Sequence, residues 1–196
     1  MEMPSDALTT LPDDALLVLY ANGDRHAAQA LTARLLPRVF RQARHMLGDA
    51  SEAEDVAQDA MVRLWRIAPD WRKGEAQVTT WLYRVTANLC TDRLRKRRGV
   101  GLDEIAEPED PAPSAAQRLQ DRARGAALQQ ALDQLPERQR QAVVLRHIEG
   151  LPNPEIADVM EISPRAVESL TARGKRALAA LLAGRRAELG YDDETA

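Results

Sequence analysis

The chain has 196 residues and a formal net charge of −3, with 29% charged and 4% aromatic residues. Its Leu-, Ala- and Arg-rich body contains no run of alternating β-branched residues, which excludes a predominantly β fold and favours helices. The single cysteine, Cys90, excludes a disulfide framework, and no apolar stretch is long enough for insertion into a membrane.

Helical patterning begins near residue 13. Residues 1–24 hold five acids and no Lys or Arg, the opposite of a secretory signal, so we expect a cytoplasmic, all-α protein. A short helix is predicted over 13–22. Asp24 can cap a second helix with an apolar residue at nearly every fourth position: Ala27, Leu31, Leu35, Val39, Ala43 and Leu47. Pro37 lies within this helix and is expected to kink it, because proline lacks an N–H donor.

A third helix is predicted from a capping box at Ser51 and Glu54 to about residue 68. Four residues form its apolar side: Ala53, Ala57, Ala60 and Leu64. The opposite side gathers Asp55, Gln58 and Asp59 near Arg66. The residues alone assign no purpose to this acidic side, since carboxylates on a surface helix are usually only solvated.

A fourth helix is predicted from Thr79 or Thr80 to residue 98. Its polar side has residues spaced by three and four: Trp81, Arg84, Asn88, Thr91 and Arg95. The opposite side is mainly apolar: Leu82, Val85, Thr86 and Leu89. Residues 93–98 add five positive charges. An aromatic ring that stacks a base, beside cations that hold phosphates, favours binding of single-stranded nucleic acid. The alternative is that Trp81 packs on the preceding loop and Asn88 only faces water.

Helical patterning stops over residues 99–116, which contain two glycines, three prolines and five acids. This composition is typical of a flexible linker. We therefore expect two small helical domains, at residues 10–98 and 117–186, with a tail at 187–196.

The second domain begins with a helix over 117–134 and a second helix that starts at Pro136 and stops at Gly150. Two cap-and-proline pairs follow, Asn153-Pro154 and Ser163-Pro164, ten residues apart. A short helix, a tight turn and another helix at this spacing predict a helix-turn-helix, the motif that places its second helix in the DNA major groove.

The last helix has an apolar side and a cationic side. The residues expected to point inward are Val167, Leu170, Gly174 and Leu178. Those expected to point outward are Arg165, Ser169, Ala172, Arg173 and Arg176. Each of these arginines could contact either a base or a phosphate of the DNA.

The chain shows no pattern typical of an enzyme. Its three histidines are scattered, and it has no glycine-rich phosphate loop and no Cys/His spacing that would hold zinc. We therefore predict no catalytic residue, no bound metal and no cofactor.

Four segments, taken in order, resemble a known family. They are AEDVAQDAMVRLWR (53–66), TWLYRVTAN (80–88) with its basic tail, LPERQRQAVVLRHIEGL (135–151) and PEIADVMEISPRAVESLTARGKRAL (154–178). Together they resemble an extracytoplasmic-function (ECF, group IV) sigma factor of bacterial RNA polymerase, in the sigma-70 superfamily. The resemblance implies an alternative sigma factor that binds core RNA polymerase and directs it to specific promoters.

The resemblance also implies residue roles. Asp55, Gln58 and Asp59 match the segment that docks on the clamp helices of the largest core subunit. Five residues match or adjoin the segment that opens and reads the minus-ten element: Trp81, Tyr83, Arg84, Asn88 and Arg95. The outward residues of the last helix match the reader of the minus-thirty-five duplex: Arg165, Ser169, Ala172, Arg173 and Arg176.

Partners follow from the same resemblance. The acidic linker would thread a positively charged polymerase channel. An anti-sigma protein, which binds zinc in some members of the family, would hold the factor inactive until a stress signal arrives.

Three positions depart from the family pattern. Glu161 stands where the turn usually holds glycine, and positive φ there would strain it by about 1 kcal/mol. Glu168 and Leu170 stand where basic residues are common.

Two other interpretations fit the residues. An ordinary helix-turn-helix regulator would bind duplex DNA without polymerase. The N-terminal half could instead be an interaction module with its tryptophans in the core.

Overall fold

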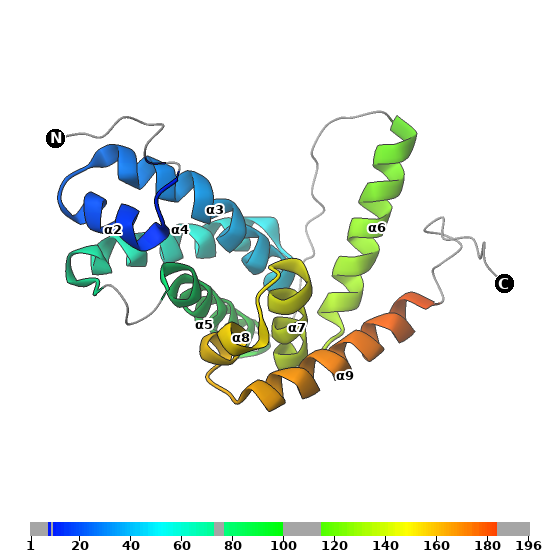
Figure 1. The fold of residues 1–196 in the computed structure, drawn as a ribbon. Helices are drawn as coiled ribbons and strands as arrows, with labels where there is room; N and C mark the ends of the chain where they lie inside the picture. Colours follow the sequence, from blue (N-terminus) through cyan, green and yellow to red (C-terminus); the bar gives the residue numbers. More distant parts are fainter. Residues whose placement is uncertain (1–7, 9, 73–76, 100–114, 184–196) are drawn as a thin grey trace.

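The computed structural model describes Leu8 and residues 10–72, 77–99 and 115–183 (Figure 1). Within these ranges every regular element is helical, which confirms the all-α fold class. The elements are α2 (Asp13–Ala21), α3 (Arg25–Leu47), α4 (Ala50–Ile67), the 3-10 turn η1 (Ala68–Asp70), α5 (Val78–Gly99), α6 (Ala115–Asp133), α7 (Glu137–Val143), the π-helical turn η2 (Val144–Ile148), α8 (Asn153–Met160) and α9 (Pro164–Ala183). The predicted linker lies almost wholly outside the described residues.

Helices α2–α5, here called the N-terminal unit, pack around one core. The apolar residues of α3 that recur every fourth position are almost completely buried, from Ala27 at 0% exposed to Leu47 at 3%. Asp24 caps α3 as predicted, because its carboxylate accepts the N–H groups of His26 and Ala27. Pro37 does not interrupt α3, which is continuous through it.

Several helix boundaries differ from the predictions. The cap of α4 is Asp49, whose carboxylate accepts the N–H of Glu52 at 2.8 Å, so the predicted Ser51 capping box is wrong. Gly48, at φ 76°, ends α3 in the left-handed region and leaves room for only one further residue before α4. Helix α7 begins at Glu137, one residue after the predicted Pro136, and α8 begins at Asn153, one residue before the predicted Pro154. In both helices a proline directly precedes the first helical residue.

Helices α6–α9, here called the C-terminal unit, contain the predicted helix-turn-helix as α8 and α9. Ser163 caps α9, with Oγ accepting the N–H of Ala166 at 3.2 Å. Val167 and Gly174 of α9 are buried. A Cβ placed on Gly174 would lie 2.6 Å from Cγ2 of Val143, so α9 approaches α7 more closely than a side chain would allow.

The two units pack against each other. Tyr83 of α5 belongs to the apolar cluster of the C-terminal unit, together with Leu145 and Ile156. Figure 1 shows α8 lying against α5, so the second unit covers part of the first. Across the described ranges, none of the helices combines the length and apolar character needed to cross a bilayer.

Candidate nucleic-acid and partner-binding surfaces

Helix α9 presents a cationic face to solvent. All five residues predicted to point outward are exposed: Arg165, Ser169, Ala172, Arg173 and Arg176. Val167 and Gly174 hold the opposite side of the helix against the C-terminal core. Arg173 donates from Nε to the carbonyl of Ser169 at 3.2 Å, one turn earlier in the same helix. A helix exposed in this way, behind a helix-turn-helix turn, has the form of a major-groove reader.

The outer part of α5 is only partly open to solvent. Asn88 is exposed, and the Arg95 side chain is 76% exposed, with Asp92 at 3.7 Å. Trp81 is half-buried and meets Trp71 edge-on, with the ring centroids 6.2 Å apart. Trp71 lies before α5, so the structure has the contact between Trp81 and the preceding segment that the sequence left as an alternative.

Tyr83 and Arg84 face the C-terminal unit. Tyr83 is 5% exposed, and its hydroxyl donates to Glu149 at 2.8 Å. Burial, together with the Glu149 carboxylate, raises the pKa of Tyr83. Arg84 donates to the carbonyl of Asp158 at 2.9 Å and lies 3.4 Å from Oε1 of Glu161. The fold therefore divides the five α5 residues predicted to bind DNA between solvent and the junction of the two units.

Helix α4 presents a mixed acidic and apolar surface. Asp55, Gln58 and Asp59 are exposed, whereas Ala53, Ala57, Ala60 and Leu64 on the opposite side are at most 1% exposed. Val62 lies one turn beyond Gln58 and is 44% exposed, the highest exposure of a large hydrophobic residue in the described ranges. We call Asp55, Gln58, Asp59 and Val62 the α4 surface. Val62 was not among the residues predicted from the sequence. An apolar residue on the otherwise polar side of the predicted helix is the signal that could have identified it.

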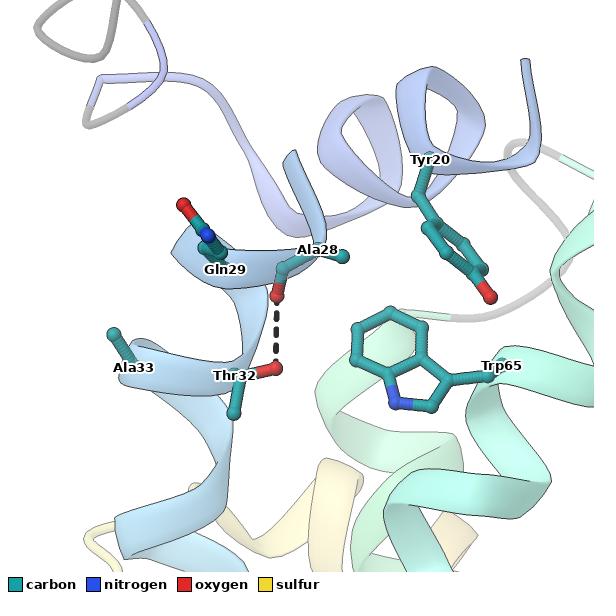
Figure 2. A pocket seen from close by; sticks show the side chains of 6 residues that line it. All are labelled: Tyr20, Ala28, Gln29, Thr32, Ala33 and Trp65. Carbon is teal, nitrogen blue, oxygen red and sulfur yellow. Dashed lines mark hydrogen bonds between the residues drawn. The ribbon is translucent and has the colours of Figure 1, made fainter. Parts of the chain in front are cut away.

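Two cavities open on the described surface. One, of about 440 Å³, lies between α2, α3 and α4 and is lined by Tyr20, Ala28, Gln29, Thr32, Ala33 and Trp65 (Figure 2). Tyr20 and Trp65 form its aromatic wall, with ring centroids 4.7 Å apart. The other, of about 1000 Å³, lies between the units and includes Arg38, Arg84 and Asp158.

Ionisable and metal-ligating groups do not gather into a reactive centre in the part of the chain that the structure describes. No cluster of three His, Cys, Asp or Glu side chains occurs there. Burial raises the pKa of the Cys90 thiol to about 12, so this cysteine remains a thiol at neutral pH.

Two family matches cover the two units. Residues 31–100 match Sigma-70 region 2, and residues 125–178 match Sigma-70 region 4. The chain is 35% identical over 178 residues to the ECF RNA polymerase sigma factor SigE of Mycolicibacterium smegmatis, covering 87% of this chain and 68% of that protein. It is also 35% identical over 170 residues to SigM of Mycobacterium tuberculosis, covering 87% of this chain and 84% of that protein.

Solved structures show the same arrangement of helices. The structure of CnrH in complex with the cytosolic domain of CnrY matches with a TM-score of 0.67 at 29% identity, over 88% of this chain and 97% of that one. The sigma factor RpoE in complex with the anti-sigma factor NepR from Bartonella quintana matches with a TM-score of 0.63 over 78% of this chain and 94% of that one, and at 21% identity it supports the fold alone.

Proposed function

The chain belongs to the extracytoplasmic-function (ECF) sigma factors of the sigma-70 family, and from this premise we propose how its surfaces work. It is an alternative sigma factor that binds core RNA polymerase and directs it to specific promoters. We infer that it belongs to group IV and acts in the cytoplasm with the polymerase. The sigma-70 family is not an enzyme family, and we assign no catalytic residue.

The exposed cationic face of α9 is the observation that carries this proposal. Residues 10–98 form the domain for core polymerase and minus-ten binding, and residues 117–186 form the domain for minus-thirty-five binding. Residues 99–116 are the acidic linker and residues 187–196 the tail. In the minus-thirty-five domain, α9 enters the major groove, and the five exposed residues named above contact bases or phosphates.

The α4 surface binds the clamp helices of the largest core subunit. Its acids suit a cationic partner, and Val62 supplies an apolar contact in their midst. The opposite side of α4 is committed to the core of the N-terminal unit, so this surface is the side of α4 that remains available.

Helix α5 binds the minus-ten element. Asn88 and Arg95 are already exposed and can meet a separated strand, with Trp81 at its edge. Tyr83 and Arg84 complete the surface once α8 has moved from α5. Opening a duplex costs a few kcal/mol per flipped base, and stacking on aromatic rings returns about 1–3 kcal/mol per base.

An anti-sigma factor holds this protein inactive until a stress signal arrives. The similar protein CnrH has been solved in complex with the cytosolic domain of CnrY, which supports a protein partner that binds this chain as well. Any zinc in such an assembly belongs to the partner, because no metal-ligating cluster occurs among the residues described here.

Reconstituted transcription tests the proposal. Purified protein is added to core polymerase with a library of promoter fragments, and the selected transcripts are sequenced. We expect promoter-specific initiation that is lost when Arg165 and Arg176 are both changed to Ala, and retained when the exposed Arg138 of α7 is changed to Ala. If the protein bound a specific duplex tightly without core polymerase and supported no initiation when core was added, a helix-turn-helix regulator would be favoured instead.

A further inference from the structure

Helix α9 carries a single acid beside its cationic face. Its twenty residues include four bases: Arg165, Arg173, Lys175 and Arg176. Glu168 is the one acid of the helix. It is exposed and lies three residues after Arg165 and four before Ala172, which are the spacings of neighbours on one side of a helix. Figure 1 shows α9 along the lower edge of the described part of the molecule. Glu168 therefore adjoins the face that is proposed to enter the major groove.

The Glu168 carboxylate is not committed to another part of the protein. Within the described ranges it forms no hydrogen bond and no ion pair. Glu168 is the fifth residue of α9 and so lies beyond the first turn, in which the helix dipole stabilises an acid. Ala172, one turn later, ends in a methyl group, so a base edge can approach the carboxylate from that side. The fold therefore leaves this carboxylate available to a ligand of α9.

A carboxylate on a helix that reads DNA is unfavourable unless it meets a hydrogen-bond donor. Phosphates repel it, so it weakens binding to every sequence that offers no donor at its position. The donors in the major groove are the amino groups of cytosine (N4) and adenine (N6), whereas guanine and thymine present acceptors. Adenine also places its N7 acceptor beside the amino group, which repels a carboxylate. Cytosine is therefore the base that best suits Glu168.

We propose that Glu168 determines specificity at one position of the minus-thirty-five duplex, where its carboxylate accepts a hydrogen bond from N4 of cytosine. The proposal rests on the major-groove role proposed for α9. The arginines of α9 attract any duplex when they contact its phosphates, and this attraction carries little sequence information. Glu168 instead penalises each wrong base at its position, so it raises the ratio of specific to non-specific binding.

Selection of duplexes by the reconstituted holoenzyme tests this proposal. Core polymerase carrying the full chain selects from promoter fragments in which only the minus-thirty-five region is randomised, and the bound fragments are sequenced. We expect one position at which cytosine is preferred about tenfold over guanine or thymine. In Glu168→Ala this preference should disappear while the preferences at other positions remain, because the exposed side chain makes no contact on which the fold depends.

Two exchanges at the same residue sharpen the test. Glu168→Gln should move the preference at that position to adenine, because a glutamine amide can bond N6 and N7 of adenine together. Glu168→Arg should move it to guanine, whose N7 and O6 both accept. The matched control is Glu161→Gln. The Glu161 carboxylate is also exposed but lies 3.4 Å from Arg84 of α5, so its removal should leave every base preference unchanged.

The selected sequences separate a role in base recognition from a role of charge alone. A charge that acts only through the overall field would change the affinity for all duplexes by the same factor and leave the base preferences intact. Identical preferences in the unaltered protein and in Glu168→Ala would therefore overturn the role of Glu168, even if the affinity rose. If the holoenzyme selected no minus-thirty-five sequence at any position, the major-groove role of α9 itself would be overturned.

Discussion

At the turn between α8 and α9, Glu161 has φ 54° and ψ 48°, the left-handed conformation that glycine adopts without penalty. The N–H of Ile162 donates back to the Ala157 carbonyl at 3.1 Å, which closes the turn. The positive φ on which the strain expected from the sequence depends is therefore present at Glu161. The Glu161 side chain is 72% exposed and lies near Arg84, so its ion pair contributes little in return.

Replacing Glu161 with Gly should raise the free energy of unfolding by about 0.5–1 kcal/mol, because glycine has no Cβ to strain the turn. Urea denaturation of the full chain measures this change. Glu161→Ala is the control, since it removes the same ion pair but keeps the Cβ. Equal stabilities of the Gly and Ala variants would contradict the strain argument.

Gly174 has a steric reason to be glycine. Its Cβ would meet Cγ2 of Val143 at 2.6 Å and the Gln139 carbonyl at 3.2 Å. Gly174→Ala should therefore lower the free energy of unfolding by about 1–3 kcal/mol. Gly125 of α6 is the matched control, because a Cβ there meets nothing within 4 Å. Gly125→Ala should be neutral or stabilising by up to about 1 kcal/mol, and equal losses at both positions would argue against close packing of α7 on α9.

At the scale of single elements, α9 and α4 each separate a buried side from a recognition side. In α9 the buried side centres on Val167 and Gly174, with Leu170 and Leu178 packed half-buried beside them, and the cationic side remains open to a groove of DNA. In α4 the buried side alternates alanines with larger apolar residues (Val56, Met61 and Leu64), and its packing in the core turns the acids outward. The same amphipathic principle thus yields two surfaces of opposite charge.

Arg165→Ala should weaken binding of the holoenzyme to a minus-thirty-five duplex. If Arg165 contacts a phosphate, the substitution should also lower the magnitude of the slope of log affinity against log salt concentration by about 1. Fluorescence anisotropy over a salt series measures both quantities. Arg138→Ala, an exposed arginine of α7, should change neither. An equal effect of the two variants would mean that the charge acts through the overall field and not through α9.

Val62→Asp should weaken binding to core polymerase by about tenfold or more, because it places a desolvated charge in the apolar contact proposed for the α4 surface. Titration of labelled protein with core measures the change. Gln29→Asp introduces the same charge at an exposed position of α3 and should leave the affinity unchanged. Unaltered core binding by a folded Val62→Asp protein would remove Val62 from the proposed interface.

At the scale of the whole molecule, the junction between the units includes a histidine. Nδ1 of His45 lies 3.0 Å from Oε1 of Gln129 in α6, and burial lowers the pKa of His45 below its usual 6.5. Burial also lowers the pKa of His147. Protonation of either side chain is therefore easier in the unfolded chain than in the folded one.

The unfolded state binds more protons than the folded state as pH falls below the ordinary histidine pKa, so stability should decrease in that range. We expect a lower free energy of unfolding at about pH 5.5 than at about pH 7.5. His45→Gln should reduce this difference. Urea unfolding of both proteins at each pH measures it, and an identical pH dependence in the variant would exclude His45 as a contributor.

Helix content, the helix-turn-helix and the exposed sides of α4 and α9 could be predicted because each depends on residues a few positions apart. Asp24 and Ser163 cap the helices that follow them, and spacing alone placed Val167 and Gly174 inside. Ser51 was the wrong cap for α4, because the helix begins earlier, at Ala50, and Asp49 accepts the N–H of Glu52 once Gly48 has turned the chain. Local alternatives of this kind differ by too little free energy for sequence patterns to separate them.

The amino-acid sequence by itself determined most of the helices and their faces, since periodicity and capping are local properties, and the four motifs in their order carried the resemblance to the family. Only the tertiary structure decided that Tyr83 lies inside the C-terminal cluster and that Arg41 meets Glu149, 108 residues away. A helical projection shows which residues share a side but not what that side contacts. Such long-range pairs depend on how two completed units pack, and no spacing within either unit encodes them.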